Sequence, residues 1–179
     1  MCEHTRLLDA KNSSLLPGFY ESHMHLFGGG VSLSQLNLSA VLDEQALREA
    51  VLSHAQQHPE ASVLSCFAAN YTIVGEERRL DRRLLDSIVA DIPLYIVATD
   101  FHTAWANTRA LELAGILEGY TFKSEAQVVL AEDGLATGEL REFEAMNLVS
   151  QLTDTAGREA LGLTADEPAA VSQEQFESD

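Results

Sequence analysis

The chain has 179 residues, of which 46% are hydrophobic and 22% are charged. This composition is typical of one folded domain, or of part of a larger one, and excludes a wholly disordered chain. Acidic residues outnumber basic ones by 28 to 11, so the formal charge at neutral pH is −17. Because such a charge repels phosphate backbones and anionic lipid headgroups, we expect no nucleic-acid partner and no membrane partner.

The sequence also indicates the compartment. No run approaches the roughly 18–20 apolar residues of a membrane-spanning helix. The N-terminal residues lack the apolar stretch of a secretory signal peptide. Cys2 and Cys66 lie far apart and outside any CxxC spacing, which is typical of free thiols in a reducing compartment. We therefore expect a soluble, cytoplasmic domain.

The first predicted element follows a short lead, residues 1–14. Apolar and aromatic residues predict a strand over 15–27, and Pro17-Gly18 bends its entry. Three consecutive glycines, residues 28–30, come next and allow a sharp turn or a close approach to a ligand. Residues 15–35 are therefore interpreted as one strand followed by a glycine-rich loop.

Strand-like and helix-like runs then alternate along the chain. Asp43 is placed to cap a helix over 44–57, and Asp81 to cap a shorter helix. We expect Thr103 to cap a third helix, which Gly115 ends. The strands predicted in this part of the chain are 35–41, 62–69 and 93–99.

The last third of the chain contains a hairpin signal and an acidic segment. Asp133-Gly134 lies between two apolar segments, which predicts a hairpin, and residues 142–152 predict a helix. Residues 153–179 hold seven acidic residues against one basic residue and predict a solvated tail or linker. The alternation of elements places the unit 36–152 in the α/β class, with a small mixed sheet and flanking helices.

His23 and His25 carry the clearest chemical signal. Side chains at i and i+2 of a strand point to the same face, so both imidazoles can reach one point in space, together with Glu21. Imidazole is a ligand of borderline cations such as Zn²⁺, and a catalytic zinc site uses about three protein ligands and one open position. A His-x-His pattern also occurs by chance, so both interpretations stay open on these residues alone.

Three segments together resemble one enzyme family. Residues 17–25, Pro-Gly-Phe-Tyr-Glu-Ser-His-Met-His, resemble the opening strand of the amidohydrolase superfamily, with Glu21 in place of the usual aspartate. Residues 100–108 are similar to the Asp-Gly-His-x-x-Trp-x-Asn-Ser/Thr run of amidohydrolase family 3. Residues 133–142 resemble the Asp-Gly-x-x-x-Gly-x-Leu-Arg-Glu run of that branch, the YtcJ-like proteins that include N-substituted formamide deformylases.

The resemblance implies a chemistry and a set of site residues. His23 and His25 would be two ligands of a divalent metal, expected to be zinc, which activates water to hydrolyse amide- or formamide-type small molecules. The residues expected on the substrate side are His102, Trp105, Asn107 and Glu142. Alternatives are a core role for Trp105, a bond from Asn107 to its own helix, and a favourable helix-start charge for Glu142. Asp100 is expected to orient His102 if the backbone there is extended.

The family unit resembles a (β/α)₈ barrel, of which this chain would hold the first strand and an α/β insertion. No histidine follows His102, so the expected further ligands are not found in this sequence. We therefore expect part of a metal-dependent hydrolase that is inactive alone. The alternatives are a non-catalytic binding or assembly module and one chain of a split amidohydrolase. Exposed strand edges would favour self-association.

Three other groups of residues are given structural interpretations. Arg78, Arg79, Arg82 and Arg83 are expected to form surface ion pairs with Glu76, Glu77, Asp81 and Asp86. Cys66 lies in an apolar run and predicts a packed thiol. His54 and His58 belong to the helix 44–57 and its exit, where we expect solvated or half-buried side chains.

Overall fold

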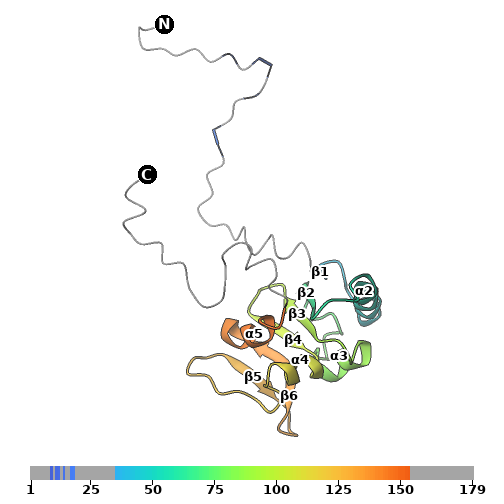
Figure 1. Ribbon diagram of the computed structural model, residues 1–179, viewed down its shortest axis with the longest axis vertical. Coiled ribbons are helices and arrows are strands. Elements are labelled where there is room, and N and C mark those ends of the chain that lie inside the picture. Colours follow the sequence, from blue (N-terminus) through green and yellow to red (C-terminus); the bar gives the residue numbers. More distant parts are fainter. Residues whose placement is uncertain (1–8, 10, 13, 15–16, 19–34, 154–179) are drawn as a thin grey trace.

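The computed structural model describes residues 35–153, together with residues 9, 11–12, 14 and 17–18 (Figure 1). The strand predicted over 15–27 lies outside the described residues except for Pro17-Gly18, and so do the triple glycine and the acidic segment after residue 153. No helix among the residues that the structure describes is long and apolar enough to cross a membrane.

One six-stranded mixed sheet forms the centre of the described part, in the order β1-β2-β3-β4-β6-β5. The first three strands in this order run parallel, and β4, β6 and β5 add antiparallel neighbours. The predicted α/β class with a small mixed sheet is thereby confirmed. The strands are β1 (Leu36–Asn37), β2 (Leu64–Ala69), β3 (Leu94–Ala98), β4 (Thr103–Ala106), β5 (Gln127–Leu130) and β6 (Ala136–Arg141).

Two helices begin where the sequence predicts, at aspartate caps. The Asp43 carboxylate accepts a hydrogen bond from the Ala46 amide at 2.8 Å, and Asp81 does the same for Leu84 at 2.9 Å. Each cap satisfies a backbone N–H that has no partner inside its helix. The helices are α2 (Glu44–Gln57), α3 (Arg82–Ile88), α4 (Thr108–Leu113) and α5 (Glu142–Ser150).

Two predictions of element boundaries were wrong. Thr103 does not cap a helix: Thr103–Ala106 is strand β4, paired with β3 on one side and β6 on the other. The helix begins later, at Thr108, with Asn107 as its cap. The strand expected over 35–41 is only Leu36–Asn37 long, because the chain turns after Leu38.

Each face of the sheet is covered by its own pair of helices. Successive residues of β3, such as Tyr95 and Ile96, belong to different clusters, as expected for side chains that alternate across a sheet. One cluster packs α2 and α3 on β2 and β3, and the other packs α4 and α5 on β3, β4, β5 and β6. Cys66 lies in the first cluster with no exposed surface, so the prediction of a packed thiol is confirmed.

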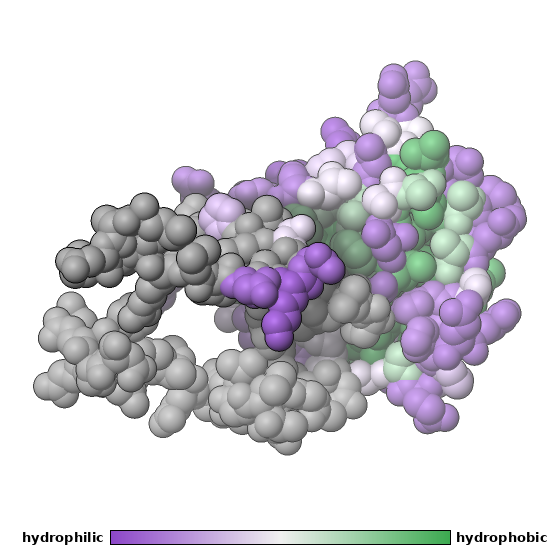
Figure 2. Space-filling view, turned by 90° about the horizontal axis from the view of Figure 1, so that it is seen from above, coloured by the Kyte–Doolittle hydropathy of each residue, from purple (hydrophilic) through white to green (hydrophobic). Residues whose placement is uncertain are grey.

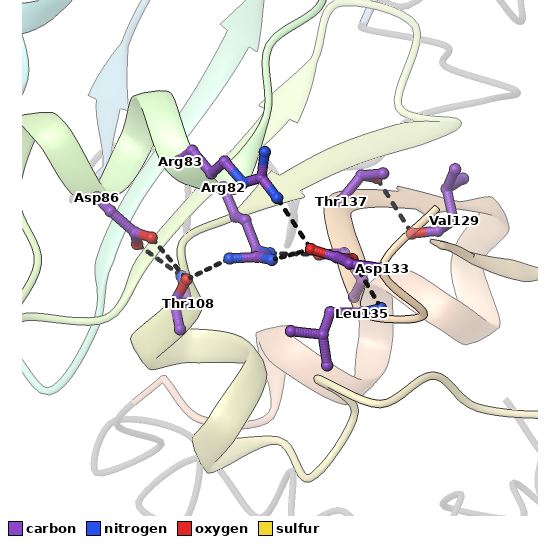
Figure 3. Close-up of polar contacts among 9 residues, drawn as sticks. Arg82, Arg83, Asp86, Thr108, Val129, Asp133, Leu135 and Thr137 are labelled. Atoms are coloured by element: carbon purple, nitrogen blue, oxygen red, sulfur yellow. Dashed lines mark hydrogen bonds and ion pairs between the residues drawn. The ribbon is translucent and has the colours of Figure 1, made fainter. Parts of the chain in front are cut away.

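A polar clasp ties α3 to the β5–β6 hairpin. Figure 3 shows Arg82 and Arg83 converging on Asp133, which lies in the turn of the hairpin. The Arg83 Nη2–Asp133 Oδ2 distance is 2.9 Å, and Arg82 Nε donates to the Ala136 carbonyl at 2.6 Å. Most of the Arg82 side chain is removed from solvent, with 12% exposed.

The ion pairs of the arginine cluster differ from those expected from the sequence. Arg82 and Arg83 pair with Asp133, and Arg78 pairs with Glu44. The neighbouring acids have other roles: Asp81 caps α3, and Asp86 accepts hydrogen bonds from the amide and hydroxyl of Thr108. Sequence proximity did not predict these partners, because helix geometry aims the two arginines across to a hairpin fifty residues away.

Gly138 allows this close approach of α3 to the sheet. Its φ is +103°, and a Cβ built there would lie 2.6 Å from the Ala106 carbonyl oxygen and 2.8 Å from the Arg82 amide nitrogen. No side chain fits at such distances, so the start of α3, β4 and β6 can meet only over a glycine. The glycine of the Thr137-Gly138-Glu139 run is therefore a packing requirement of this fold.

Hydrophilic residues dominate the coloured part of the face in Figure 2, with hydrophobic residues exposed between them. Single exposed apolar residues are normal on a globular surface. Among the described residues, the large hydrophobic side chains that are most exposed are Leu42, Phe101 and Phe143. Phe101 adjoins His102, and Phe143 adjoins Glu142.

Candidate functional site

One end of the sheet brings together His102 and Glu142, two of the predicted site residues. The parallel strands β2 and β3 both end here, and β4 starts beside the end of β6, with Thr103 opposite Arg141. The loops that leave this edge and the first residue of α5 form what we call the carboxyl-end rim: Tyr71, Asp100, Phe101, His102 and Glu142. Loops held by a rigid sheet are the usual place for binding and catalytic groups.

The backbone at this edge is strained. Phe101 has φ +62° and Glu142 has φ +65°, and Ala68, at the irregularity near the end of β2, has φ +61°. A non-glycine residue in this left-handed region costs about 1–3 kcal/mol, which the surrounding fold must offset. Such residues cluster at functional sites, because the strain holds side chains in orientations that relaxed backbone would not give.

His102 and Glu142 form a contact across forty residues of sequence. His102 Nδ1 lies 3.2 Å from Glu142 Oε2, and the Glu142 amide donates to the His102 carbonyl at 2.8 Å. Both side chains remain accessible, with 70% and 52% of their surface exposed. An ionised carboxylate can only accept a hydrogen bond, so Glu142 favours the tautomer that carries its proton on Nδ1 and leaves Nε2 free.

Asp100 holds the loop rather than the imidazole. Its Oδ1 accepts from the His102 backbone amide at 3.1 Å, and its Oδ2 accepts from the Tyr71 hydroxyl at 3.0 Å. The expected contact with the His102 ring required extended backbone, whereas the positive φ of Phe101 turns the chain between them. Asp100 therefore acts on His102 through the main chain.

Tyr71 belongs to the rim, although no sequence pattern identifies it as a site residue. Its ring packs edge-on against Trp105, with centroids 5.3 Å apart, and its hydroxyl reaches Asp100. Burial and the nearby Asp100 carboxylate raise the pKa of Tyr71, so its hydroxyl stays protonated at neutral pH. An aromatic residue one position after Asn70 in a loop has no pattern that distinguishes it from a core residue.

Trp105 and Asn107 lie away from the exposed part of the rim. Trp105 is 3% exposed and belongs to the core under α2 and α3, where it supports Tyr71. Asn107 is fully buried. Its Oδ1 accepts from the Leu94 and Ala110 amides, and its Nδ2 donates to the Val89 and Ile92 carbonyls, all within 2.9–3.0 Å.

Those four bonds exhaust the hydrogen-bonding capacity of the Asn107 amide. The residue joins α3, β3 and α4, and it has no free polar atom for a substrate. The geometry thus matches the structural alternative considered for Asn107, extended from its own helix to two other segments.

A polar groove runs beside the rim on the face of the sheet that carries α3. It encloses about 390 Å³, and alternate residues of β6, Thr137, Glu139 and Arg141, form its floor. Arg141 directly precedes Glu142, so the groove and the rim are neighbours. The sequence contained a signal for this groove, namely polar residues at every second position of a strand-like run. The other lining residues are Arg79, Leu80, Asp81 and Val129.

The predicted metal ligands, His23 and His25, lie outside the described residues, as does Glu21. Within the described residues, no group of three or more His, Cys, Asp or Glu side chains could hold a metal ion. The metal site stays a prediction from the sequence.

Comparison with known proteins supports the resemblance read from the motifs. The model of the amidohydrolase family matches residues 6–177. Over 136 residues the chain is 27% identical to the protein YtcJ of Bacillus subtilis (strain 168), covering 76% of this chain and 26% of that protein. Over 114 residues it is 26% identical to the N-substituted formamide deformylase of Arthrobacter pascens, covering 62% of this chain and 21% of the deformylase.

A solved structure shows the same likeness. The crystal structure of an uncharacterized metal-dependent hydrolase from Pyrococcus furiosus matches with a TM-score of 0.52 and 25% identity, covering 76% of this chain and 25% of that one. The chain thus spans about a quarter of the length of the relatives it matches.

Proposed function

The chain belongs to the amidohydrolase family, and we propose that it supplies part of the active site of a metal-dependent hydrolase acting on C–N bonds other than peptide bonds. Support for the bond type comes from the N-substituted formamide deformylase among its relatives, and support for the metal from the metal-dependent hydrolase among its structural neighbours. The observation that carries the proposal is the His102–Glu142 pair, because it joins two residues of separate family-like segments at one exposed edge.

The donor chemistry of the N-terminal segment suits a divalent cation. Two imidazoles, from His23 and His25, with the Glu21 carboxylate nearby in sequence, are the donors that zinc prefers. When bound, such a cation supplies an activated water and polarises the carbonyl of the substrate. We place the segment 15–35 as the first strand of a TIM-like barrel and 36–152 as an insertion, in a cytoplasmic protein.

The rim would act on the substrate side of that centre. Glu142 holds the proton on Nδ1 of His102, so Nε2 can accept a hydrogen bond from the N–H of an amide-type substrate. Phe101 and Phe143, 64% and 76% exposed, offer apolar walls beside this polar pair. A small number of placed polar groups between apolar walls is the usual composition of a small-molecule site.

The same two phenylalanines favour a second candidate, in which the rim docks on another part of the catalytic unit. Both side chains are largely exposed. Covering them with a further segment or chain would stabilise the complex by about 25 cal/mol per Å² of apolar surface buried. In a split amidohydrolase, the segment or chain that covers the rim would supply the remaining metal ligands, and this chain alone would be inactive. A non-catalytic binding module would use the same surface without supplying ligands.

Zinc binding tests the metal part of the proposal. The melting temperature of the chain should rise with zinc concentration, because a ligand of the folded state stabilises it. A His23→Ala, His25→Ala double variant should lose most of this shift. An unchanged shift in the double variant would remove these two residues as metal ligands.

Ligand binding tests the rim. N-substituted formamides titrated into the chain should shift the NMR signals of the His102 imidazole. Glu142→Gln should weaken the binding free energy of the formamide by about 1–2 kcal/mol, because a charge-assisted hydrogen bond to His102 is lost. Glu144→Gln is the matched control, since Glu144 lies in the same helix and bonds Ser124 instead. Equal effects of the two variants, or shifts that avoid His102, would refute the role of the rim.

A further inference from the structure

A second pair of histidines lies at the end of α2, unrelated to the family motifs. His54 is in the last turn of the helix, and His58 is its C-terminal cap, whose amide donates to the His54 carbonyl at 3.0 Å. The two ring centroids are 4.4 Å apart, and the ring planes are tilted by 53°. Neither ring makes a hydrogen bond or ion pair with any residue in the described part of the chain.

The pair has the spacing of a chelate. Residues at i and i+4 of a helix lie on one face, and two imidazoles in this relation can bind a single ion. Each Zn–N bond is about 2.0–2.1 Å, so both nitrogens must come within roughly 4 Å of each other. The ring centroids are 4.4 Å apart, so the two imidazoles lie close enough to approach one ion together.

Solvent can reach this face of the helix. His58 is exposed and His54 is half-buried, so an ion bound between them would complete its coordination with water. Imidazole nitrogens suit Zn²⁺, Cu²⁺ and Ni²⁺, whereas Mg²⁺ and Ca²⁺ prefer oxygen ligands. We propose that His54 and His58 form a second cation site, a two-imidazole chelate for a borderline divalent metal on α2.

The composition of the segment argues against a hydrolytic role for this site. In the helical zinc motif H-E-x-x-H, the residue after the first histidine is a glutamate that serves as general base. Here that position is Ala55, and the described residues offer no third ligand to the pair. The bound ion would instead link the cap residue to the last turn of α2, which stabilises the helix end just before Pro59.

Copper titration of the full chain tests the proposal. A His23→Ala, His25→Ala variant that also carries Cys2→Ser and His4→Ala is used as background, so that neither the predicted catalytic site nor the thiol and imidazole near the N-terminus contribute. Calorimetry with Cu²⁺ should then show one binding event, and His58→Gln should weaken it by about 100-fold, because the second imidazole acts at high effective concentration. Electron paramagnetic resonance of bound Cu²⁺ should show two nitrogen ligands, reduced to one by His58→Gln.

A rearranged variant provides the matched control. Gln56→His combined with His58→Gln keeps the number of histidines and the charge, but places the second imidazole two residues from His54, away from its face of the helix. This variant should bind copper as weakly as His58→Gln, while His102→Ala should bind as tightly as the background. Full affinity in the rearranged variant, or loss of binding in His102→Ala, would overturn the proposal. Helix content from circular dichroism without metal checks that each variant is folded.

Discussion

Replacing Gly138 with alanine should be one of the most destabilising single-methyl additions in this protein. The new Cβ would meet two backbone atoms, the Ala106 oxygen at 2.6 Å and the Arg82 nitrogen at 2.8 Å, and backbone cannot rotate away as a side-chain end can. The φ of +103° adds a second penalty, since L-residues with a Cβ rarely adopt it.

The magnitude follows from the two effects. The left-handed backbone costs an alanine about 1–2 kcal/mol, and forcing α3 away from the β4–β6 pair resembles overpacking, at about 1–3 kcal/mol. We therefore expect Gly138→Ala to lower the free energy of unfolding by about 2–5 kcal/mol. This is a large share of the 5–15 kcal/mol that stabilises an ordinary domain.

Gly75 allows the two effects to be separated. Its φ is +95°, close to that of Gly138, but a Cβ there meets nothing within 4 Å. Urea unfolding of Gly75→Ala should thus report the backbone penalty alone, about 1–2 kcal/mol, and the difference between the two variants is the cost of the clash. If Gly138→Ala proves no more destabilising than Gly75→Ala, the start of α3 does not pack as closely against β6 as described, and Gly138 is not a packing requirement of the fold.

Three further predictions concern buried or paired groups. Asn107→Ala should cost about 3 kcal/mol in urea unfolding, because buried amides and carbonyls lose partners; a cost below 1 kcal/mol would refute the joint role. Burial raises the pKa of Cys66 to about 12, so in a Cys2→Ser background it should resist thiol reagents at pH 8 until urea unfolds the chain. Since its folded pKa exceeds the unfolded one, stability should fall above pH 9 by up to about 1.4 kcal/mol per pH unit, and Cys66→Ala should remove that slope. The Leu135 amide, Arg83 and Arg82 lower the pKa of Asp133, so the clasp should weaken as acid protonates this carboxylate; Asp133→Asn should unfold with less dependence on acidic pH, and identical profiles would contradict this.

Local signals in the amino-acid sequence were enough to predict several elements of the fold. Asp43 and Asp81 cap their helices because a side-chain oxygen next to a helix start satisfies an amide that has no other partner nearby. The hairpin at Asp133-Gly134 likewise follows from a turn whose glycine has φ +80°. The family could also be recognised from the sequence, because motifs in a fixed order along the chain can be identified without three-dimensional information.

The position of β4 and the contacts between side chains from distant segments depend on the whole fold. Thr103–Ala106 is too short to show a periodicity of its own, and it becomes a strand because β3 and β6 supply hydrogen bonds on both sides. That pairing sets Thr103 opposite Arg141, so the residues that adjoin them, His102 and Glu142, emerge together at the sheet edge. Contacts between distant segments depend on strand register, and no local pattern encodes a register between segments forty residues apart.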